Sequence, residues 1–292
     1  MSTKETWTVG RVLAWATDDL RARDSETPRL DAELLLAHAL GVNRIGLIVD
    51  RDRPLSDEEL AKYRALHKRR RAAEPVAYML GFREFYGRPF KVDPRVLIPR
   101  PDTETLVDVA LRRTRERSLS LAMLDLCTGS GCVAVTIAKE RPTARVLGTD
   151  ISEDALAVAR ENAVRLGAIP AAFFRQSDLF AAVPPDGPFA LITANPPYIA
   201  QGEKLADTIV KHEPHVALFG GPDGYAVTKR IVAEAPAFLE PGGVLAMELG
   251  AGQADAVAHM LEERGFVDIE RAKDYGGIER VVSGVWPGTT TS

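Results

Sequence analysis

The most specific chemical pattern in the chain is the tetrapeptide Asn195-Pro196-Pro197-Tyr198, which ends an apolar stretch at residues 189–195. Two consecutive prolines remove two backbone donors and fix two φ angles, so they predict a rigid turn after a strand. The Asn195 side-chain oxygen and the Pro196 carbonyl are two acceptors that suit the N–H groups of an amide or an exocyclic amine. Tyr198 offers a flat face to a planar group. We assign substrate binding to all four residues and catalysis by positioning to Asn195, Pro196 and Tyr198.

A second pattern predicts a cofactor loop between an apolar strand and a helix. Its glycines permit a tight turn and a close approach of a ligand to the backbone. The helix that follows offers free N–H groups and the positive end of its dipole. Asp150, nineteen residues beyond Gly131, ends the next expected strand, where its carboxylate can accept both hydroxyls of a ribose. The loop residues assigned to the cofactor are Asp125, Cys127, Thr128, Gly129, Ser130 and Gly131.

The glycine loop alone leaves two cofactors open. Gly129 to Ala134 also fits the G-x-G-x-x-A fingerprint of a dinucleotide site, so an NAD-dependent oxidoreductase is an alternative. Asp125 stands four residues before the first glycine, where a carboxylate suits a cationic amino-acid headgroup better than a pyrophosphate. In addition, no second nucleotide-binding half follows. Together with the clamp at Asn195, these features favour an S-adenosylmethionine-dependent N-methyltransferase.

The remainder of the chain predicts the scaffold that positions both motifs. From residue 122 onward, apolar stretches alternate with helical periodicity, which is typical of a largely parallel sheet with helices on both faces. No helical stretch separates the last two expected strands, so they predict an antiparallel hairpin at the sheet edge. The fold class is α/β: a doubly wound, Rossmann-like, mostly parallel seven-stranded sheet. The expected strands are 122–127, 144–150, 171–177, 189–195, 243–249, 267–273 and 280–285.

The first part of the chain predicts a small all-α domain. Apolar residues recur at helical spacing at 9–20 and 31–40, and Ser56 with Glu59 forms the sequence signature of a capping box. Glycines, prolines and aromatic residues at 81–100 then predict a short hairpin and linker. We therefore divide the chain into a helical substrate-recognition domain at 1–80, a hairpin linker at 81–100 and a catalytic domain at 101–287.

Composition narrows the range of partners. Of the 292 residues, 46% are hydrophobic and 27% charged, and the formal net charge is −4. A protein that grips nucleic-acid phosphates usually carries a basic surplus, so we expect no direct nucleic-acid partner. No apolar run approaches the roughly 20 residues of a membrane span. The two cysteines, Cys127 and Cys132, suit a reducing compartment, and we expect a cytoplasmic monomer.

The motifs, taken in order, resemble those of the PrmC/HemK family, the protein-(glutamine-N5) methyltransferases that act on peptide chain release factors. The resemblance covers nearly the full length, and the ordered set is more specific than the short clamp motif, which occurs in several N-methyltransferases. The similar blocks lie at residues 28–37, 74–78, 81–87, 97–104, 125–131, 150–152, 195–198, 212–214 and 220–224.

This resemblance implies a class I methyltransferase domain, a five-helix N-terminal domain and S-adenosylmethionine as the methyl donor. It implies that the substrate is the glutamine of a Gly-Gly-Gln loop in class I release factors. It adds Asp178 and Leu179 to the cofactor contacts, and Asn195 is shared between cofactor and substrate. Cys127 stands where relatives commonly have glycine, so we expect a negative φ there. Leu179 replaces a larger aromatic residue.

Three other interpretations fit the sequence less well. A nucleic-acid amino-methyltransferase would use the same clamp for the exocyclic amine of a base, but the acidic composition disfavours it. A cofactor-binding module without activity would not need the clamp. His212 and His215 have the spacing of a metal pair, but Pro214 interrupts the helix that would align them, so we expect no metal there. We expect instead a loop over the active site, with Gly220, Gly221 and Gly224 as hinges.

Overall fold

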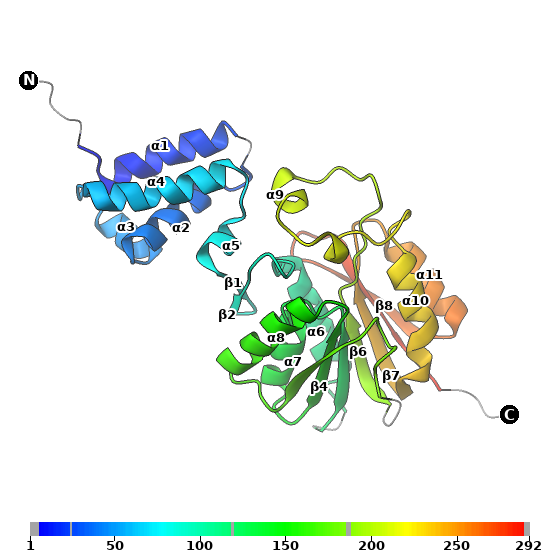
Figure 1. The fold of residues 1–292 in the computed structure, drawn as a ribbon. Coiled ribbons are helices and arrows are strands. Elements are labelled where there is room, and N and C mark those ends of the chain that lie inside the picture. Colours follow the sequence, from blue (N-terminus) through cyan, green and yellow to red (C-terminus); the bar gives the residue numbers. More distant parts are fainter. Residues whose placement is uncertain (1–5, 24, 118–119, 185–187, 289–292) are drawn as a thin grey trace, which may run out of the picture. The chain divides into compact units, whose positions relative to one another are not determined.

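The computed structural model describes residues 6–23, 25–117, 120–184 and 188–288. Its internal contacts divide the chain into two compact units. The first unit comprises Met1–Gly81 and the short segment Ala206–His212, and the second comprises Phe82–Leu205 and Glu213–Ser292. Figure 1 follows the elements of both units along the chain. Within the described ranges, no helix is long and apolar enough to cross a membrane.

The first unit is built from helices. Thr8, Asn43 and Ser56 each accept a backbone N–H at a helix start, and Gly41 ends the second helix in the left-handed conformation. The predicted capping box between Ser56 and Glu59 is confirmed. The apolar faces of these helices meet in one core around Leu20, Leu35, Leu36 and Tyr63. The helices are α1 (Val9–Arg21), α2 (Pro28–Leu40), α3 (Arg44–Val49), α4 (Asp57–Arg71), α5 (Val76–Leu80) and α9 (Asp207–Val210).

The second unit contains the predicted seven-stranded sheet, with the order β5-β4-β3-β6-β7-β9-β8. The first five strands in this order run parallel, and β9 pairs antiparallel with both β7 and β8. The antiparallel hairpin at the edge is therefore confirmed. The strands are β3 (Ala122–Leu126), β4 (Arg145–Asp150), β5 (Ala172–Gln176), β6 (Phe189–Ala194), β7 (Leu239–Glu248), β8 (Val267–Lys273) and β9 (Glu279–Val285).

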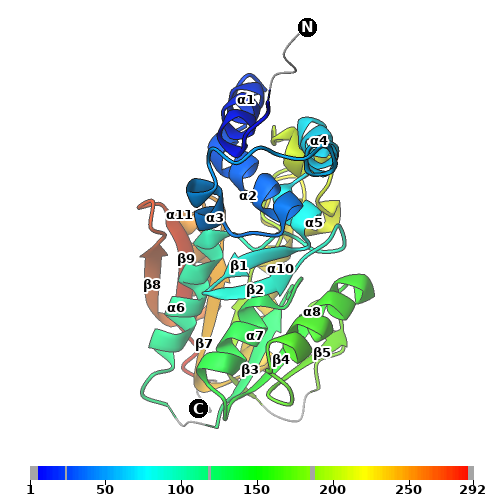
Figure 2. The ribbon, with the colours of Figure 1, turned by 90° about the vertical axis from the view of Figure 1, so that its left-hand side faces the viewer.

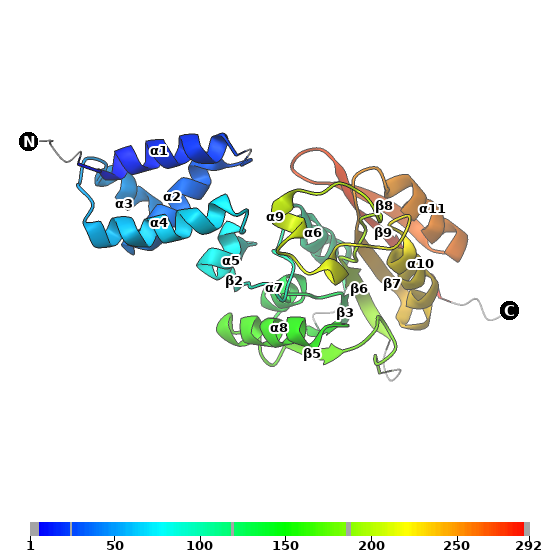
Figure 3. The same ribbon diagram turned by 45° about the horizontal axis from the view of Figure 1, so that its top comes forward.

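Helices cover both faces of this sheet, because successive side chains of each strand point to opposite faces. Met123 and Leu191 pack in one core cluster, while their neighbours Leu124 and Ile192 pack in the other. Figure 2 shows α6, α7 and α8 along one face, and Figure 3 shows α10 and α11 on the other. These helices are α6 (Glu104–Arg113), α7 (Cys132–Glu140), α8 (Glu153–Arg165), α10 (Ala226–Glu234) and α11 (Ala254–Arg264), with 3-10 turns at η1 (Pro101–Thr103), η2 (His215–Ala217) and η3 (Ala235–Ala237).

The hairpin of β1 (Phe82–Phe85) and β2 (Arg88–Lys91) belongs to the second unit. Asn162 on α8 is fully buried and fastens this hairpin to the glycine loop. Its Oδ1 accepts from the Lys91 N–H at 2.7 Å, and its Nδ2 donates to the carbonyls of Lys91 at 3.0 Å and Ser130 at 2.9 Å. One side chain thus satisfies three backbone groups, of which the Ser130 carbonyl is fully buried.

Replacing Asn162 with leucine should destabilise the protein strongly. Each backbone group left without a partner costs about 1–3 kcal/mol, so the loss should be at least about 3 kcal/mol. Denaturant unfolding measures this loss. The matched control is Glu161→Ala, which removes an exposed ion pair to the Lys91 side chain and should cost less than about 1 kcal/mol. Equal effects of the two substitutions would contradict the role given to Asn162.

Candidate active site

The two chemical motifs meet where the strand order reverses. The chain leaves β3 toward β4 on one side, and β6 lies on the other side of β3. In open α/β sheets ligands bind at this point, beyond the carboxyl ends of the strands. Leu126 pairs with Ala194, so the next residues, Cys127 and Asn195, leave the sheet from neighbouring positions. The glycine loop and the clamp therefore stand side by side at one edge.

The glycine loop departs from the expected backbone at one residue. Cys127 has φ +55°, so the predicted negative φ is wrong. Gly129 and Gly131 also have positive φ, at +53° and +78°. Cys127 thus adopts the left-handed conformation that glycine tolerates best. The positive φ of Cys127 could not be predicted from the sequence, because the loop imposes this conformation and a cysteine does not favour it.

Both cysteines are free thiols; Cys132 is buried and Cys127 is partly buried. Burial raises the pKa of Cys132 to about 12 and also raises the pKa of Cys127. Because the thiolate is the nucleophilic form, neither side chain is activated at neutral pH. Cys127 is a wall of the site and not a nucleophile.

Asp125 is a buried carboxyl group, 2% exposed, at the carboxyl end of β3. Its Oδ2 accepts from the Thr128 hydroxyl at 2.6 Å and its Oδ1 accepts from the Thr193 hydroxyl at 2.8 Å. Burial raises its pKa to about 6, against the opposing effect of these two hydrogen bonds. Asp125 consequently ties the glycine loop to both β3 and β6. It also lines a small cavity of about 40 Å³, together with Thr103 and Asn195.

A larger cavity, of about 170 Å³, shares Cys127 and Asn195 with the small one as lining residues. Asp150 lines it from the end of β4. The Asp150 carboxylate accepts from the Gly129 N–H at 2.8 Å and from the Ser152 N–H at 2.9 Å, while burial raises its pKa. Apolar Ile151 and Leu179 stand beside this acid, and together they form a pocket with one acidic and one apolar wall.

Asp178 and Leu179 both line this cavity, but they present different groups. Asp178 is paired through both oxygens with Arg230, at 3.0 and 3.1 Å, and both side chains are about half exposed. Leu179 is buried and has φ +48°, with its carbonyl accepting from the Ser177 hydroxyl. Arg230, on α10, was not identified from the sequence, since nothing local to it marks its partner.

The clamp side chains are held by two residues that sequence reasoning missed. Asn195 Nδ2 donates to the Thr103 hydroxyl at 3.3 Å, and the Tyr198 hydroxyl donates to Glu248 Oε1 at 3.4 Å. Burial and the nearby Glu248 raise the pKa of Tyr198. Glu248 ends β7 at the same edge of the sheet. An acidic residue at the end of an apolar strand is the signal that could have found it.

The clamp backbone is fixed by close packing. A Cβ atom added to Gly220 would come within 2.4 Å of the Pro197 carbonyl oxygen, and one added to Gly224 within 2.4 Å of that of Tyr198. The Tyr198 carbonyl also accepts from Gln253 Nε2 at 3.1 Å. Gly220 and Gly224 are therefore needed because the backbones touch, a reason that the hinge hypothesis did not consider.

The segment between His212 and His215 contains a buried acid. Glu213, which follows His212 in sequence, is buried; it accepts from the Ile98 N–H at 3.1 Å through Oε2 and from Arg100 at 2.5 Å through Oε1. His212 belongs to the first unit and His215 to the second. Among the described residues, no group of three or more potential metal ligands is present. The buried acid anchors the segment that leads into η1 and Thr103.

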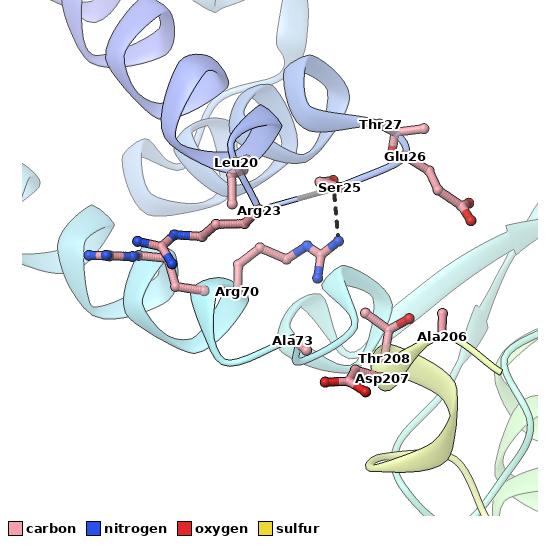
Figure 4. Close-up of a pocket in the computed structure, with 11 residues that line it drawn as sticks. Leu20, Arg23, Ser25, Glu26, Thr27, Arg70, Ala73, Ala206, Asp207 and Thr208 are labelled. Atoms are coloured by element: carbon pink, nitrogen blue, oxygen red, sulfur yellow. Dashed lines mark hydrogen bonds between the residues drawn. The ribbon is translucent and has the colours of Figure 1, made fainter. Parts of the chain in front are cut away.

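The first unit contains a cavity of about 470 Å³ between α1, α4 and α9 (Figure 4). Arg70 points into it, with Nη2 donating to the Ser25 hydroxyl at 3.3 Å. The same guanidinium donates from Nε to the buried Asp31 carboxylate at 2.8 Å. Because its charge is already paired inside the unit, Arg70 does not make this cavity an anion site.

Comparisons with known proteins agree with this geometry. Residues 11–81 match the PrmC N-terminal domain, and residues 103–221 match the methyltransferase small domain. The chain is 46% identical to a release factor glutamine methyltransferase of Geobacter sulfurreducens, over 96% of this chain and 97% of that protein. A methyltransferase from Pyrococcus furiosus superposes with a TM-score of 0.52 and 18% identity, covering 70% of this chain and 91% of the other. The structure of the Thermus thermophilus 16S rRNA N2 G1207 methyltransferase in complex with AdoMet and guanosine superposes with a TM-score of 0.52 and 19% identity. The match covers 70% of this chain and 49% of the other.

The fold and the site define the class: this is a methyltransferase with the seven-stranded class I architecture and a small helical unit ahead of it. The full-length identity then gives the family. The chain belongs to the release factor glutamine methyltransferases.

The positive φ at Cys127 leads to a stability test. Cys127→Val should be less stable than Cys127→Gly by about 1–3 kcal/mol, because a β-branched residue is strained in the left-handed region. The same pair of substitutions at Cys132, in the first turn of α7, should give the reverse order, since glycine is the poorer helix residue. Thermal or denaturant unfolding of the four variants would measure both orders. An identical order at the two positions would show that side-chain volume, and not backbone conformation, decides the effect.

Proposed function

We propose that this protein transfers a methyl group from S-adenosylmethionine to the side-chain amide nitrogen of the glutamine in a release factor Gly-Gly-Gln loop. The observation that carries the proposal is the adjacency of the glycine loop and the Asn195–Tyr198 clamp at the reversal of strand order. Membership of the release factor glutamine methyltransferase family supports the same substrate.

The residues present fit the methyl donor. Asp150, at the end of β4, is the group we assign to the ribose hydroxyls, because it is an acceptor that lines the larger cavity. Ile151 and Leu179 give that cavity an apolar wall for the adenine. We assign the methionine part to the glycine loop, Cys127–Gly131, with Asp125 below it. S-adenosylmethionine supplies an electrophilic methyl group on a sulfonium sulfur.

The clamp makes an amide a better nucleophile by positioning it. An amide nitrogen is weakly nucleophilic because its lone pair is delocalised into the carbonyl group. Acceptors at Asn195 Oδ1 and the Pro196 carbonyl would hold its two N–H groups and direct the lone pair toward the methyl carbon. Tyr198 would lie against the flat amide. Methyl transfer to the nitrogen held by Asn195 and Pro196 would leave the donor sulfur as a neutral thioether, and the proton lost from the nitrogen would pass to water.

The first unit is the part of the chain that we assign to recognition of the release factor. A clamp that holds only a primary amide cannot distinguish one glutamine from another, so selectivity needs contacts remote from the reacting atom. The first unit exposes an apolar surface on α3: Ile45 is 69% exposed, Ile48 74% and Val49 77%. An apolar surface of this kind suits a protein partner better than a nucleic acid.

The function is tested by incubating the protein with labelled S-adenosylmethionine and, separately, purified release factor, DNA and RNA. Label should enter only the release factor, at the glutamine, as located by mass spectrometry. Asn195→Ala should lower kcat about 10²- to 10³-fold, the usual effect of removing a hydrogen bond made in the transition state. Gln201→Ala, an exposed amide further along the same loop, is the matched control and should keep full activity. Label in nucleic acid alone would refute the proposed substrate.

Recognition through α3 is tested with intact factor and with a short Gly-Gly-Gln peptide. Ile48→Asp should raise KM for the intact factor about 10- to 100-fold, the equivalent of one buried isoleucine side chain. The peptide kinetics should not change, because a short peptide lacks the rest of the factor surface that α3 would contact. Val164→Asp places the same charge at an equally exposed position on α8 and is the control. A similar rise in KM for both substrates would argue against a recognition surface on α3.

A further inference from the structure

Glu248 is a buried acid that the proposed function does not yet use. It is 2% exposed at the carboxyl end of β7, where the cofactor loop and the clamp also lie. Its Oε1 accepts from the Tyr198 hydroxyl at 3.4 Å. Its Oε2 is buried without a formed hydrogen bond among the described residues. Burying a carboxylate costs free energy unless hydrogen-bond donors compensate, so a buried acid at this position needs a structural or functional explanation.

The donor available to Glu248 is the hydroxyl of Thr103. Thr103 is itself 2% exposed and ends η1, directly before α6. Its hydroxyl lies near enough to Glu248 to lower the pKa of that acid. The same hydroxyl oxygen accepts from Asn195 Nδ2 at 3.3 Å. Thr103 therefore stands between the acid and the amide of the clamp.

Hydrogen-bond chemistry gives this chain of groups a single direction. An ionised carboxylate only accepts, so in a hydrogen bond between the two groups Thr103 donates its one hydrogen to Glu248. The oxygen of Thr103 is then left to accept, and the donor facing it must be the NH₂ group of Asn195. That choice turns the other end of the Asn195 side chain, Oδ1, away from Thr103. An acceptor, and not a donor, is thereby presented to the reacting amide.

We propose that Glu248 and Thr103 are positioning residues that fix the orientation of the Asn195 side-chain amide, so that Oδ1 faces the substrate N–H. This inference rests on the proposed function, because it assigns a direction to the clamp that the function requires. Without the chain of donors, the two ends of the Asn195 amide are nearly equal in shape, and the flipped form would repel the substrate N–H groups.

The protonation of Glu248 should control this orientation. Burial raises its pKa to about 7. The charged and titratable groups that face it are Asp102 on η1, Arg280 on β9, Tyr198 on the clamp and Cys132 on α7; Asp102 raises the pKa and Arg280 lowers it. Above this pKa the acid only accepts and the direction is fixed. Below it the protonated acid can donate to Thr103, and the direction is lost. Turnover should rise with pH through about 7.

The experiment measures kcat, KM and S-adenosylmethionine affinity against pH for the wild type, Glu248→Gln, Thr103→Val and Thr103→Ser. Glu248→Gln should lower kcat about 10- to 100-fold, as expected when one buried hydrogen bond is lost or reversed, and should abolish the rise near pH 7. Thr103→Val should lower kcat similarly, whereas Thr103→Ser keeps the hydroxyl and should restore most of it. Cofactor affinity, measured by calorimetry, should change less than about 3-fold, since none of these side chains is assigned to the cofactor.

The outcomes separate the two proposals. If the wild type methylates the release factor and Glu248→Gln keeps the same pH profile as the wild type, this inference alone would be overturned. Equal losses in Thr103→Val and Thr103→Ser would also overturn it, because a hydroxyl-dependent role requires that serine rescue the activity. The threonine pair keeps the test decisive if Glu248→Gln fails to fold. Absence of methylation by the wild type would overturn the proposed function and this inference with it.

Discussion

The parallel pairing of β3 with β6 is the constraint on which the rest of the site depends. These strands are far apart in sequence, yet their register puts the first residue beyond each strand at neighbouring positions. Asp125 reinforces the pairing, because it accepts hydrogen bonds from the Thr193 hydroxyl on β6 and from the Thr128 hydroxyl in the glycine loop. If the register shifted by one residue, side chains would change faces and both motifs would lose their partners.

Three buried acids connect the segments that meet at the carboxyl edge of the sheet. Asp125 links two strands and a loop, Glu213 fastens the segment before η1, and Glu248 reaches the clamp. Each is almost completely removed from solvent. A buried carboxylate demands specific donors, so it penalises alternative arrangements more than an apolar contact of the same size would. Desolvating these three acids costs free energy, but it favours one geometry of the site over the alternatives.

Sequence patterns predict the elements of this protein well and the contacts between them poorly. The expected strand 267–273 agrees with β8, and the others differ by one residue at one or both ends, except that β7 begins at Leu239 and not at 243. Alternating apolar runs bounded by glycine and proline are local signals. Cys127 shows the limit of such rules: its positive φ is imposed by its surroundings. The partners Thr103 and Asn195, or Glu213 and Ile98, are about a hundred residues apart in sequence, and no local pattern pairs them.

The division of the chain also has a topological consequence. The backbone passes from the first unit to the second after Gly81, returns to the first at Ala206 and leaves it again at Glu213. The helical unit is therefore joined by three covalent crossings and is not a detachable N-terminal module. A truncation before residue 82 would leave Ala206–His212 without its native neighbours, in the stretch between the clamp and the Glu213 anchor. Exchanging this unit between relatives would require transplanting two separate pieces of sequence together.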